Sequence, residues 1–135
     1  MVDYLAFSHQ PSTSVLVARW LRTVTPEELR QGYQELLSIA ALYKVRYWLL
    51  DLRRRGPISA ELTQWVKHTF FPNAAQELQG CLYLSYFVSP DHLELLQQAP
   101  EQLLGNTEQS LIRLFTDERQ ATEWLHQTRL QEQAA

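Results

Sequence analysis

Short apolar runs alternate with longer amphipathic stretches along most of the chain. The first two runs, residues 2–7 and 15–21, are joined by the turn-rich segment 9–14, which is too short for a parallel return. We therefore expect an antiparallel hairpin at the start of the sequence. Further runs at 45–52 and 81–88 are apolar at nearly every position, which is typical of parallel strands covered on both faces. A last strand is expected at 111–115.

Helical spacing of apolar residues fills the gaps between the later strands. Thr25, Pro26 and Glu28 form a capping signal for a first helix that should end near Tyr43. Ser59 can cap a second helix, which Phe71 and Pro72 should interrupt before a short continuation. A short helix is expected from Pro90, and a final one begins at residues 116–118 and carries Ala121, Trp124 and Leu125 on its inner face.

The order of these elements is strand, strand, helix, and then strand and helix three times more. This order predicts a single α/β domain with a mixed, mostly parallel five-stranded sheet flanked by about four helices. One strand of the first hairpin should run antiparallel at or near an edge. We expect the domain to cover residues 1–126, with 100–110 partly irregular and 127–135 a frayed tail.

Composition and charge narrow the classes of function. The 135 residues are 45% hydrophobic and carry a formal net charge of -3, so no overall basic field would attract nucleic acid. The single cysteine, Cys81, excludes an internal disulfide and a cysteine-based zinc site, and we expect it in a buried strand. The sequence shows neither a signal peptide nor the roughly 20 apolar residues of a membrane span. These features predict a cytoplasmic protein.

No recognisable catalytic group, metal site or cofactor motif stands out. The four histidines, His9, His68, His92 and His126, lack the spacing of a helical metal-binding pair. The chain also lacks the glycine-rich loop of common nucleotide-binding folds. We therefore expect no metal, no cofactor and no enzymatic activity.

Three adjacent arginines are the most conspicuous polar feature. Arg53, Arg54 and Arg55 follow the buried strand 45–52, at the carboxyl edge where α/β sheets bind ligands. Guanidinium groups pair well with carboxylate or phosphate, so we expect these residues to bind an anion or an acidic partner. The alternative is a solvated loop paired with acids such as Glu61. Asp51 at the strand end either acts in the site or holds the loop through backbone hydrogen bonds.

An aromatic group on the second helix gives another candidate surface. Trp65 and Phe70 fall on the face that should cover the sheet, and Phe71 falls just outside it. Core packing is the simpler interpretation. The alternative is a hydrophobic groove, with Trp65 and Phe71 in contact with a lipid-like ligand or a partner.

Several segments of the sequence resemble the SpoIIAA-like STAS domains, and among them the uncharacterised bacterial group labelled STAS/SEC14. The resemblance is carried by 25–28, by 47–53 followed by Trp65 and 70–72, and by 113–118 followed by Ala121 and 124–125. It implies a sheet flanked by helices and a role in binding rather than catalysis. Anti-sigma-antagonist STAS domains carry a phosphorylatable hydroxyl after the strand equivalent to 45–52. Here no hydroxyl is beside Asp51, so we expect Ser59 to be a helix cap and not a phosphosite.

Together these features predict a non-enzymatic binding or regulatory module. The expected partner is another protein, including a second copy of the chain in a homodimer. The alternative is a carrier or sensor of an apolar, lipid-like or anionic small molecule, and an unrecognised enzyme is the third possibility. A ligand-sized cavity would favour the carrier over the protein-binding module.

Overall fold

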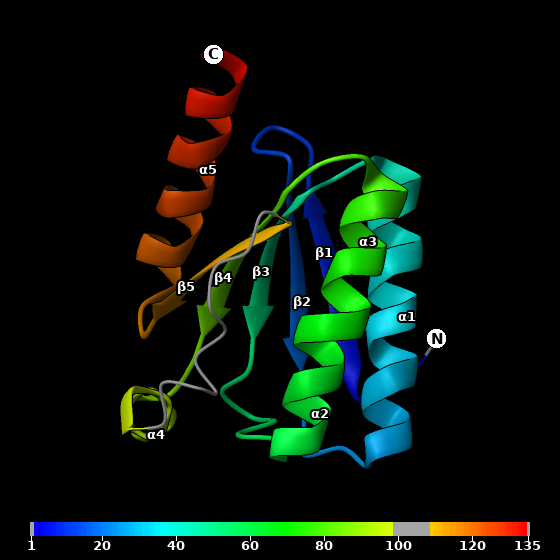
Figure 1. Ribbon diagram of the computed structural model, residues 1–135. Coiled ribbons are helices and arrows are strands. Elements are labelled where there is room, and N and C mark those ends of the chain that lie inside the picture. The colour runs from blue at the N-terminus through cyan, green and yellow to red at the C-terminus, as the bar shows by residue number, and fades with distance from the viewer. Residues whose placement is uncertain (1, 99–108, 135) are drawn as a thin grey trace.

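A five-stranded sheet lies between unequal layers of helices in the computed structural model, which describes residues 2–98 and 109–134 (Figure 1). The strands are β1 (Leu5–Gln10), β2 (Val15–Trp20), β3 (Tyr47–Asp51), β4 (Leu82–Phe87) and β5 (Ser110–Phe115), and they lie side by side in chain order. β1 pairs antiparallel with β2, and each later pair is parallel. The predicted mixed sheet with an antiparallel edge strand is confirmed.

The first strand is displaced along the chain from its expected position. It begins at Leu5 rather than at residue 2, because its register pairs Leu5 with Trp20 and Gln10 with Val15. The turn is thereby reduced to residues 11–14. The apolar residue Val2 that suggested an earlier start packs against the core without joining the sheet.

Helices cover both faces of the sheet and its lower edge (Figure 1). α1 (Pro26–Tyr43) lies on one face with a continuous helical segment made of α2 (Ala60–Trp65), the π-helix η1 (Val66–Phe70) and α3 (Phe71–Leu78). α5 (Glu118–Ala134) crosses the other face, and α4 (Pro90–Gln98) lies beyond the carboxyl ends of β3 and β4. The segment expected to be irregular, 100–110, lies outside the described residues except for its last two.

The predicted helix starts are confirmed by their hydrogen bonds. Thr25 accepts from the Glu28 backbone at 3.1 Å while the Glu28 carboxylate accepts from the Thr25 backbone at 2.9 Å, which completes the capping box. Ser59 Oγ accepts from the Leu62 backbone at 3.2 Å. Ser59 therefore caps α2, as expected.

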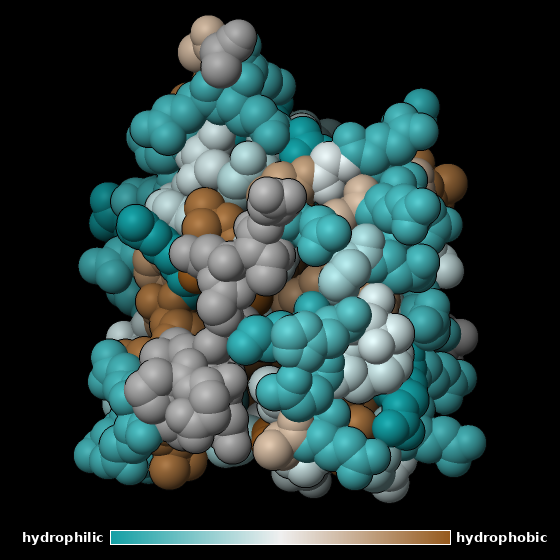
Figure 2. All heavy atoms as spheres, in the orientation of Figure 1, coloured by the Kyte–Doolittle hydropathy of each residue, from teal (hydrophilic) through white to brown (hydrophobic). Residues whose placement is uncertain are grey.

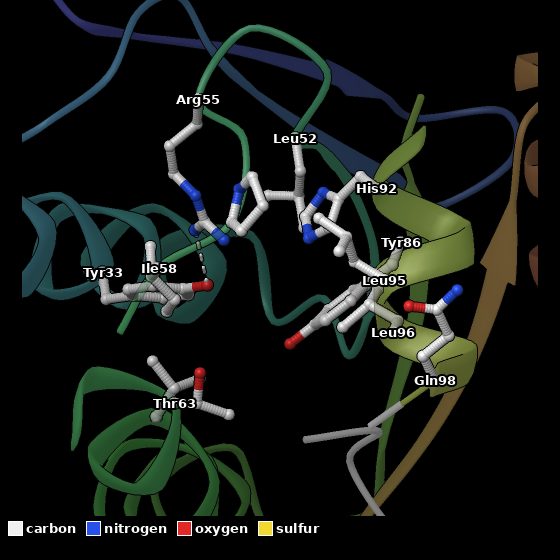
Figure 3. A pocket seen from close by; sticks show the side chains of 12 residues that line it. Tyr33, Leu52, Arg55, Ile58, Thr63, Tyr86, His92, Leu95, Leu96 and Gln98 are labelled. Atoms are coloured by element: carbon white, nitrogen blue, oxygen red, sulfur yellow. Dashed lines mark hydrogen bonds between the residues drawn. The ribbon is translucent and has the colours of Figure 1, made fainter. Parts of the chain in front are cut away.

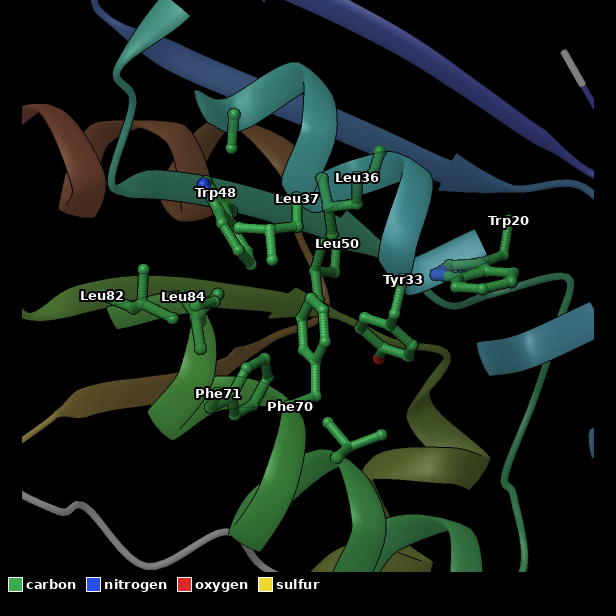
Figure 4. Packing of buried hydrophobic residues seen from close by; sticks show 14 of the residues in the cluster. Trp20, Tyr33, Leu36, Leu37, Trp48, Leu50, Phe70, Phe71, Leu82 and Leu84 are labelled. Atoms are coloured by element: carbon green, nitrogen blue, oxygen red, sulfur yellow. The ribbon is translucent and has the colours of Figure 1, made fainter. Parts of the chain in front are cut away.

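The two faces of the central strands enter separate apolar clusters. On one face Leu16, Trp48, Leu50 and Leu84 pack beneath α1 and α3 (Figure 4). On the other, a smaller cluster packs beneath α5 and contains Val15, Val17, Tyr47, Leu49, Phe87, Ala121 and Leu125. Burial of every residue of β3 confirms the prediction from its continuous apolar run.

The π-helix changes which aromatic side chains reach the core. A π-turn contains more residues than an α-turn, so η1 rotates the positions after it about the helix axis. As a result both Phe70 and Phe71 are buried, and their ring centroids lie 5.7 Å apart. The prediction that Phe71 lies outside the sheet-covering face is therefore wrong. The sequence expectation assumed a regular helix up to Pro72.

Helix α5 continues through the segment that was expected to fray. It remains helical to Ala134, where the Glu132 carboxylate accepts hydrogen bonds from Arg46, Tyr47 and Tyr83. Arg46 donates to it at 2.5 and 3.0 Å and Tyr83 at 3.1 Å. The partners of Glu132 lie more than 40 residues away in the sequence. The polar composition of the tail itself therefore gives no sign of these contacts. Among the described residues, every helix is too short or too polar to cross a membrane.

Replacement of Gly32 by alanine should destabilise the protein. A Cβ at this position would lie 2.5 Å from Cη2 and 2.9 Å from Cζ3 of the buried Trp20. Overpacking costs about 1–3 kcal/mol, and the roughly 1 kcal/mol by which alanine outranks glycine in a helix offsets only part of this. We expect urea unfolding to show a lower free energy of unfolding for Gly32→Ala than for wild type. Ser38→Ala, on the exposed side of α1, should show no loss, and an equal loss in both would contradict the close approach.

Candidate functional site

A cavity of about 380 Å³ opens at the carboxyl ends of β3 and β4 (Figure 3). It lies between α4, the start of α2 and the loop that follows β3. The volume falls within the roughly 300–1,000 Å³ of small-molecule sites. Most of the lining is apolar, and the residues are Tyr33, Leu52, Arg55, Pro57, Ile58, Thr63, Val66, Tyr86, His92, Leu95, Leu96 and Gln98.

Arg55 is a buried cation at this cavity, with 5% of its surface exposed. Its Nη1 donates to the Tyr33 hydroxyl at 3.4 Å, and its Nε donates to the Gly56 carbonyl at 3.3 Å. The guanidinium also lies over the Trp20 ring, 5.3 Å from the centroid. No Asp or Glu in residues 2–98 or 109–134 forms an ion pair with it.

Two phenols extend the polar part of the cavity. The Tyr33 oxygen accepts from Arg55, which leaves its own proton free to be donated. The Tyr86 hydroxyl points toward the cavity and has no hydrogen-bond partner within the described part of the chain (Figure 3). Burial raises the pKa of Tyr86 well above its ordinary value, so its phenol stays protonated and can donate.

His92 supplies a fourth polar group from α4. Its backbone N–H donates to Ser89 Oγ at 3.2 Å, which fixes the first turn of the helix. The side chain is 6% exposed, and its Nδ1 has no partner among the described residues. Burial and the positive charge of Arg55 both lower the pKa of His92 from its ordinary 6.5, so the imidazole is neutral at pH 7.

The three arginines predicted to share a surface point in different directions. Arg53 folds back onto the face of the sheet that α5 covers, where its guanidinium lies 4.0 Å from the Phe87 ring centroid. Arg54 is exposed, and Arg55 turns to the other face beneath Tyr33. The three guanidinium groups therefore do not form one basic patch. Residues 53–55 form a turn, closed by the Gly56 N–H donating to the Leu52 carbonyl at 2.9 Å, and this turn ends the strand alternation that would have kept Arg53 and Arg55 on one face. Of the three, only Arg55 lines the cavity.

The Asp51 carboxylate stabilises the loop after β3 and does not line the cavity. Its carboxylate accepts from the Arg53 backbone at 3.2 Å, from the Arg53 guanidinium at 2.8 and 3.0 Å, and from Arg19 at 3.0 Å. Burial raises the pKa of Asp51, but the hydrogen bonds from Arg53 and Arg19 outweigh burial and hold the pKa below its ordinary value. Arg53 thus pairs with Asp51 and not with Glu61. The loop-holding interpretation of Asp51 fits these contacts.

The two aromatic candidates lie away from the cavity. Trp65 is half-buried, with its ring centroid 5.7 Å from that of Phe70 and the Arg30 guanidinium 5.9 Å from it on the ring face. Phe71 is part of the core. Their neighbour Val66 lines the cavity instead. Neither Trp65 nor Phe71 lines this cavity, so the expected contact of these two rings with a ligand is not seen there.

A second hollow lies at the opposite edge of the sheet, near the start of β4. It encloses about 620 Å³ but is more open, and polar groups from Asn73, Gln76, Gln79 and Gln109 line much of it. Cys81 borders it and is half-buried, not the core residue expected from sequence. This hollow holds no buried charge. In the described part of the chain, no three His, Cys, Asp or Glu side chains gather to hold a metal ion.

Sequence reasoning missed Tyr33, Tyr86 and His92. Tyr33 lies within the predicted first helix, but no sequence signal connects its hydroxyl with Arg55, 22 residues away. The sequence gives His92 no feature that distinguishes it from the other histidines, and it predicts only that Tyr86 lies in a buried strand. Only the general signal that α/β sheets bind ligands at the carboxyl edge indicated this region. No family model, curated protein or solved structure matches the chain.

The neutral state of His92 predicts a specific loss of stability in acid. Because its pKa is lowered in the folded protein, the unfolded chain binds a proton first as pH falls below about 6.5. Folding should lose stability from there down to the folded-state pKa. In urea unfolding between about pH 7.5 and about pH 5.5, His92→Gln should lose less stability than wild type. Equal losses would show that His92 titrates alike in the folded and unfolded chains.

Proposed function

We propose that this chain is a non-enzymatic binding domain that carries or senses a small molecule with an apolar body. The observation that carries the proposal is the cavity at the carboxyl ends of β3 and β4. Leu52, Ile58, Val66 and Leu96 give it apolar walls, and a few polar groups converge on one part of it. This combination of an apolar wall and few placed polar groups is characteristic of small-molecule sites.

The cavity favours this function over a module that binds another protein or a second copy of itself. Besides the STAS resemblance, the protein-binding hypothesis drew on the three arginines as a contact surface and on an aromatic groove open to a ligand or a partner. The arginines diverge, and Phe71 is in the core. On the molecular face seen in Figure 2, hydrophilic residues make up most of the coloured surface, and apolar atoms gather mainly on its left side.

The polar groups of the cavity support binding better than catalysis. Its described lining contains no Asp, Glu, Cys or Ser. Its one aliphatic hydroxyl, on Thr63, donates to the Ser59 carbonyl at 2.9 Å and is thus engaged with the helix backbone. A nucleophile is normally activated by a hydrogen-bonded base. The groups that remain are suited to hold a ligand by donating hydrogen bonds to it.

The STAS resemblance supports the same class of function. We keep a SpoIIAA-like STAS arrangement as a proposal for the fold, supported by the antiparallel edge strand and the strands that follow in chain order. Ser59, the hydroxyl nearest to the end of β3, caps α2. This structural role for Ser59 supports a response to a bound small molecule over a response to phosphorylation at this position.

A neutral apolar probe should enter the cavity of the wild-type protein. We expect 1-octanol to shift the NMR signals of the methyl groups of Ile58, Val66 and Leu96, which line the cavity from three different elements. Leu96→Trp should abolish these shifts by filling the space. Leu42→Trp, on the exposed side of α1, should bind like wild type. Shifts that map elsewhere, or no saturable shift in wild type with 1-octanol or with its carboxylate analogue octanoate, would refute the proposed binding function.

A further inference from the structure

We propose that the ligand of this cavity carries a single carboxylate, bound by Arg55 with the phenols of Tyr33 and Tyr86. This inference rests on the proposed binding function and specifies the chemical class of the ligand. The cavity would then hold the carboxylate at its polar end and the apolar body against the leucine and isoleucine side chains that line the rest.

The first argument is the unbalanced charge of Arg55. A guanidinium that is 5% exposed has lost nearly all its hydration, and an uncompensated buried charge is strongly unfavourable. Contact with the Trp20 ring compensates in part. Arg53, two residues earlier and half-exposed, forms a two-point ion pair with Asp51. The chain thus pairs the exposed arginine with an acid and leaves the buried one without a counterion among the described residues.

The second argument is that the polar groups are donors. Arg55 Nη2 has no hydrogen-bond partner within residues 2–98 and 109–134, and the protons of the Tyr33 and Tyr86 hydroxyls are also free in this part of the chain. All three lie on the cavity, and the two phenols approach it from α1 and β4 (Figure 3). A carboxylate has two oxygens that only accept, and guanidinium binds it in a planar, two-point geometry. Such a group would satisfy these donors together.

The third argument selects a monoanion over a phosphate. Arg55 is the only cationic side chain in the described lining, because His92 is neutral at pH 7. A dianionic phosphate would leave one negative charge without a partner in a weakly polar site, where such charges are poorly tolerated. The cavity volume of about 380 Å³ is near the lower end for ligand sites, so the apolar body is small, such as a short alkyl chain or one ring.

Titration calorimetry with three eight-carbon probes tests the head group. For the wild-type protein we expect octanoate to bind about 10- to 100-fold more tightly than 1-octanol, which corresponds to hydrogen bonds with a charged group. Octyl phosphate should bind more weakly than octanoate. If octyl phosphate binds most tightly, the site is for phosphate and the carboxylate assignment is wrong.

Two neighbouring arginines provide a matched pair of variants. Arg55→Met should reduce the preference for octanoate over 1-octanol to about threefold or less, since it removes the charge-assisted hydrogen bonds. It should unfold in urea at the same or a higher concentration than wild type, because it removes an unpaired buried charge. Arg53→Met should keep the wild-type preference but unfold at a lower urea concentration, because Asp51 loses its partner.

The remaining outcomes separate this inference from the proposed function. If 1-octanol and octanoate bind wild type equally well in the cavity, the carboxylate assignment is overturned and the binding function stands. If neither probe binds, both fall. Should Arg55→Met fail to fold, Arg55→Lys retains the charge with fewer donors, and it should bind octanoate several-fold more weakly than wild type but still prefer it to 1-octanol. Loss of that preference with a retained charge would contradict the role of the positive charge.

Discussion

The packing of Tyr33 connects the hydrophobic core with the cavity. Its ring centroid lies 4.8 Å from that of Phe70 and 5.4 Å from that of Trp20, while its hydroxyl accepts from Arg55. Trp20 in turn contacts the Arg55 guanidinium. Gly32 lets α1 approach Trp20 closely enough for these contacts to form. The position of the buried cation is therefore fixed by the same rings that hold α1 and η1 against the sheet.

Residues 51–55, at the end of β3 and in the turn after it, place charged side chains on both faces of the sheet. Asp51 and Arg53 join Arg19 and Glu118 on the side covered by α5, where opposite charges balance one another. Arg55 emerges on the side of α1, where no acid balances it in the described structure. The strand alternation that buries Leu49 and Leu50 on opposite faces places Asp51 on the side of α5. The turn at 53–55 breaks this alternation, and Arg55 lies on the opposite face from Arg53.

The elements were predictable from sequence because their signals are local. A capping box at Thr25, a cap at Ser59 and the apolar run of β3 each specify their own neighbourhood. The site depends on contacts between distant residues: Tyr33 with Arg55, and α4 folded over the end of β4. Three identical side chains in a row carry no local signal of which one is buried. The expected fraying of residues 127–135 is wrong for the same reason: Glu132 is held by distant residues in and beside β3 and β4.

The π-helix η1 leads to an expectation for the sequences of homologous chains. Its extra residue is what brings Phe70 and Phe71 into the core together. A homologous chain one residue shorter between Trp65 and Pro72 would form a regular α-helix there, with room for only one of the two rings. An alignment should therefore show a single-residue gap coupled to the loss of one phenylalanine.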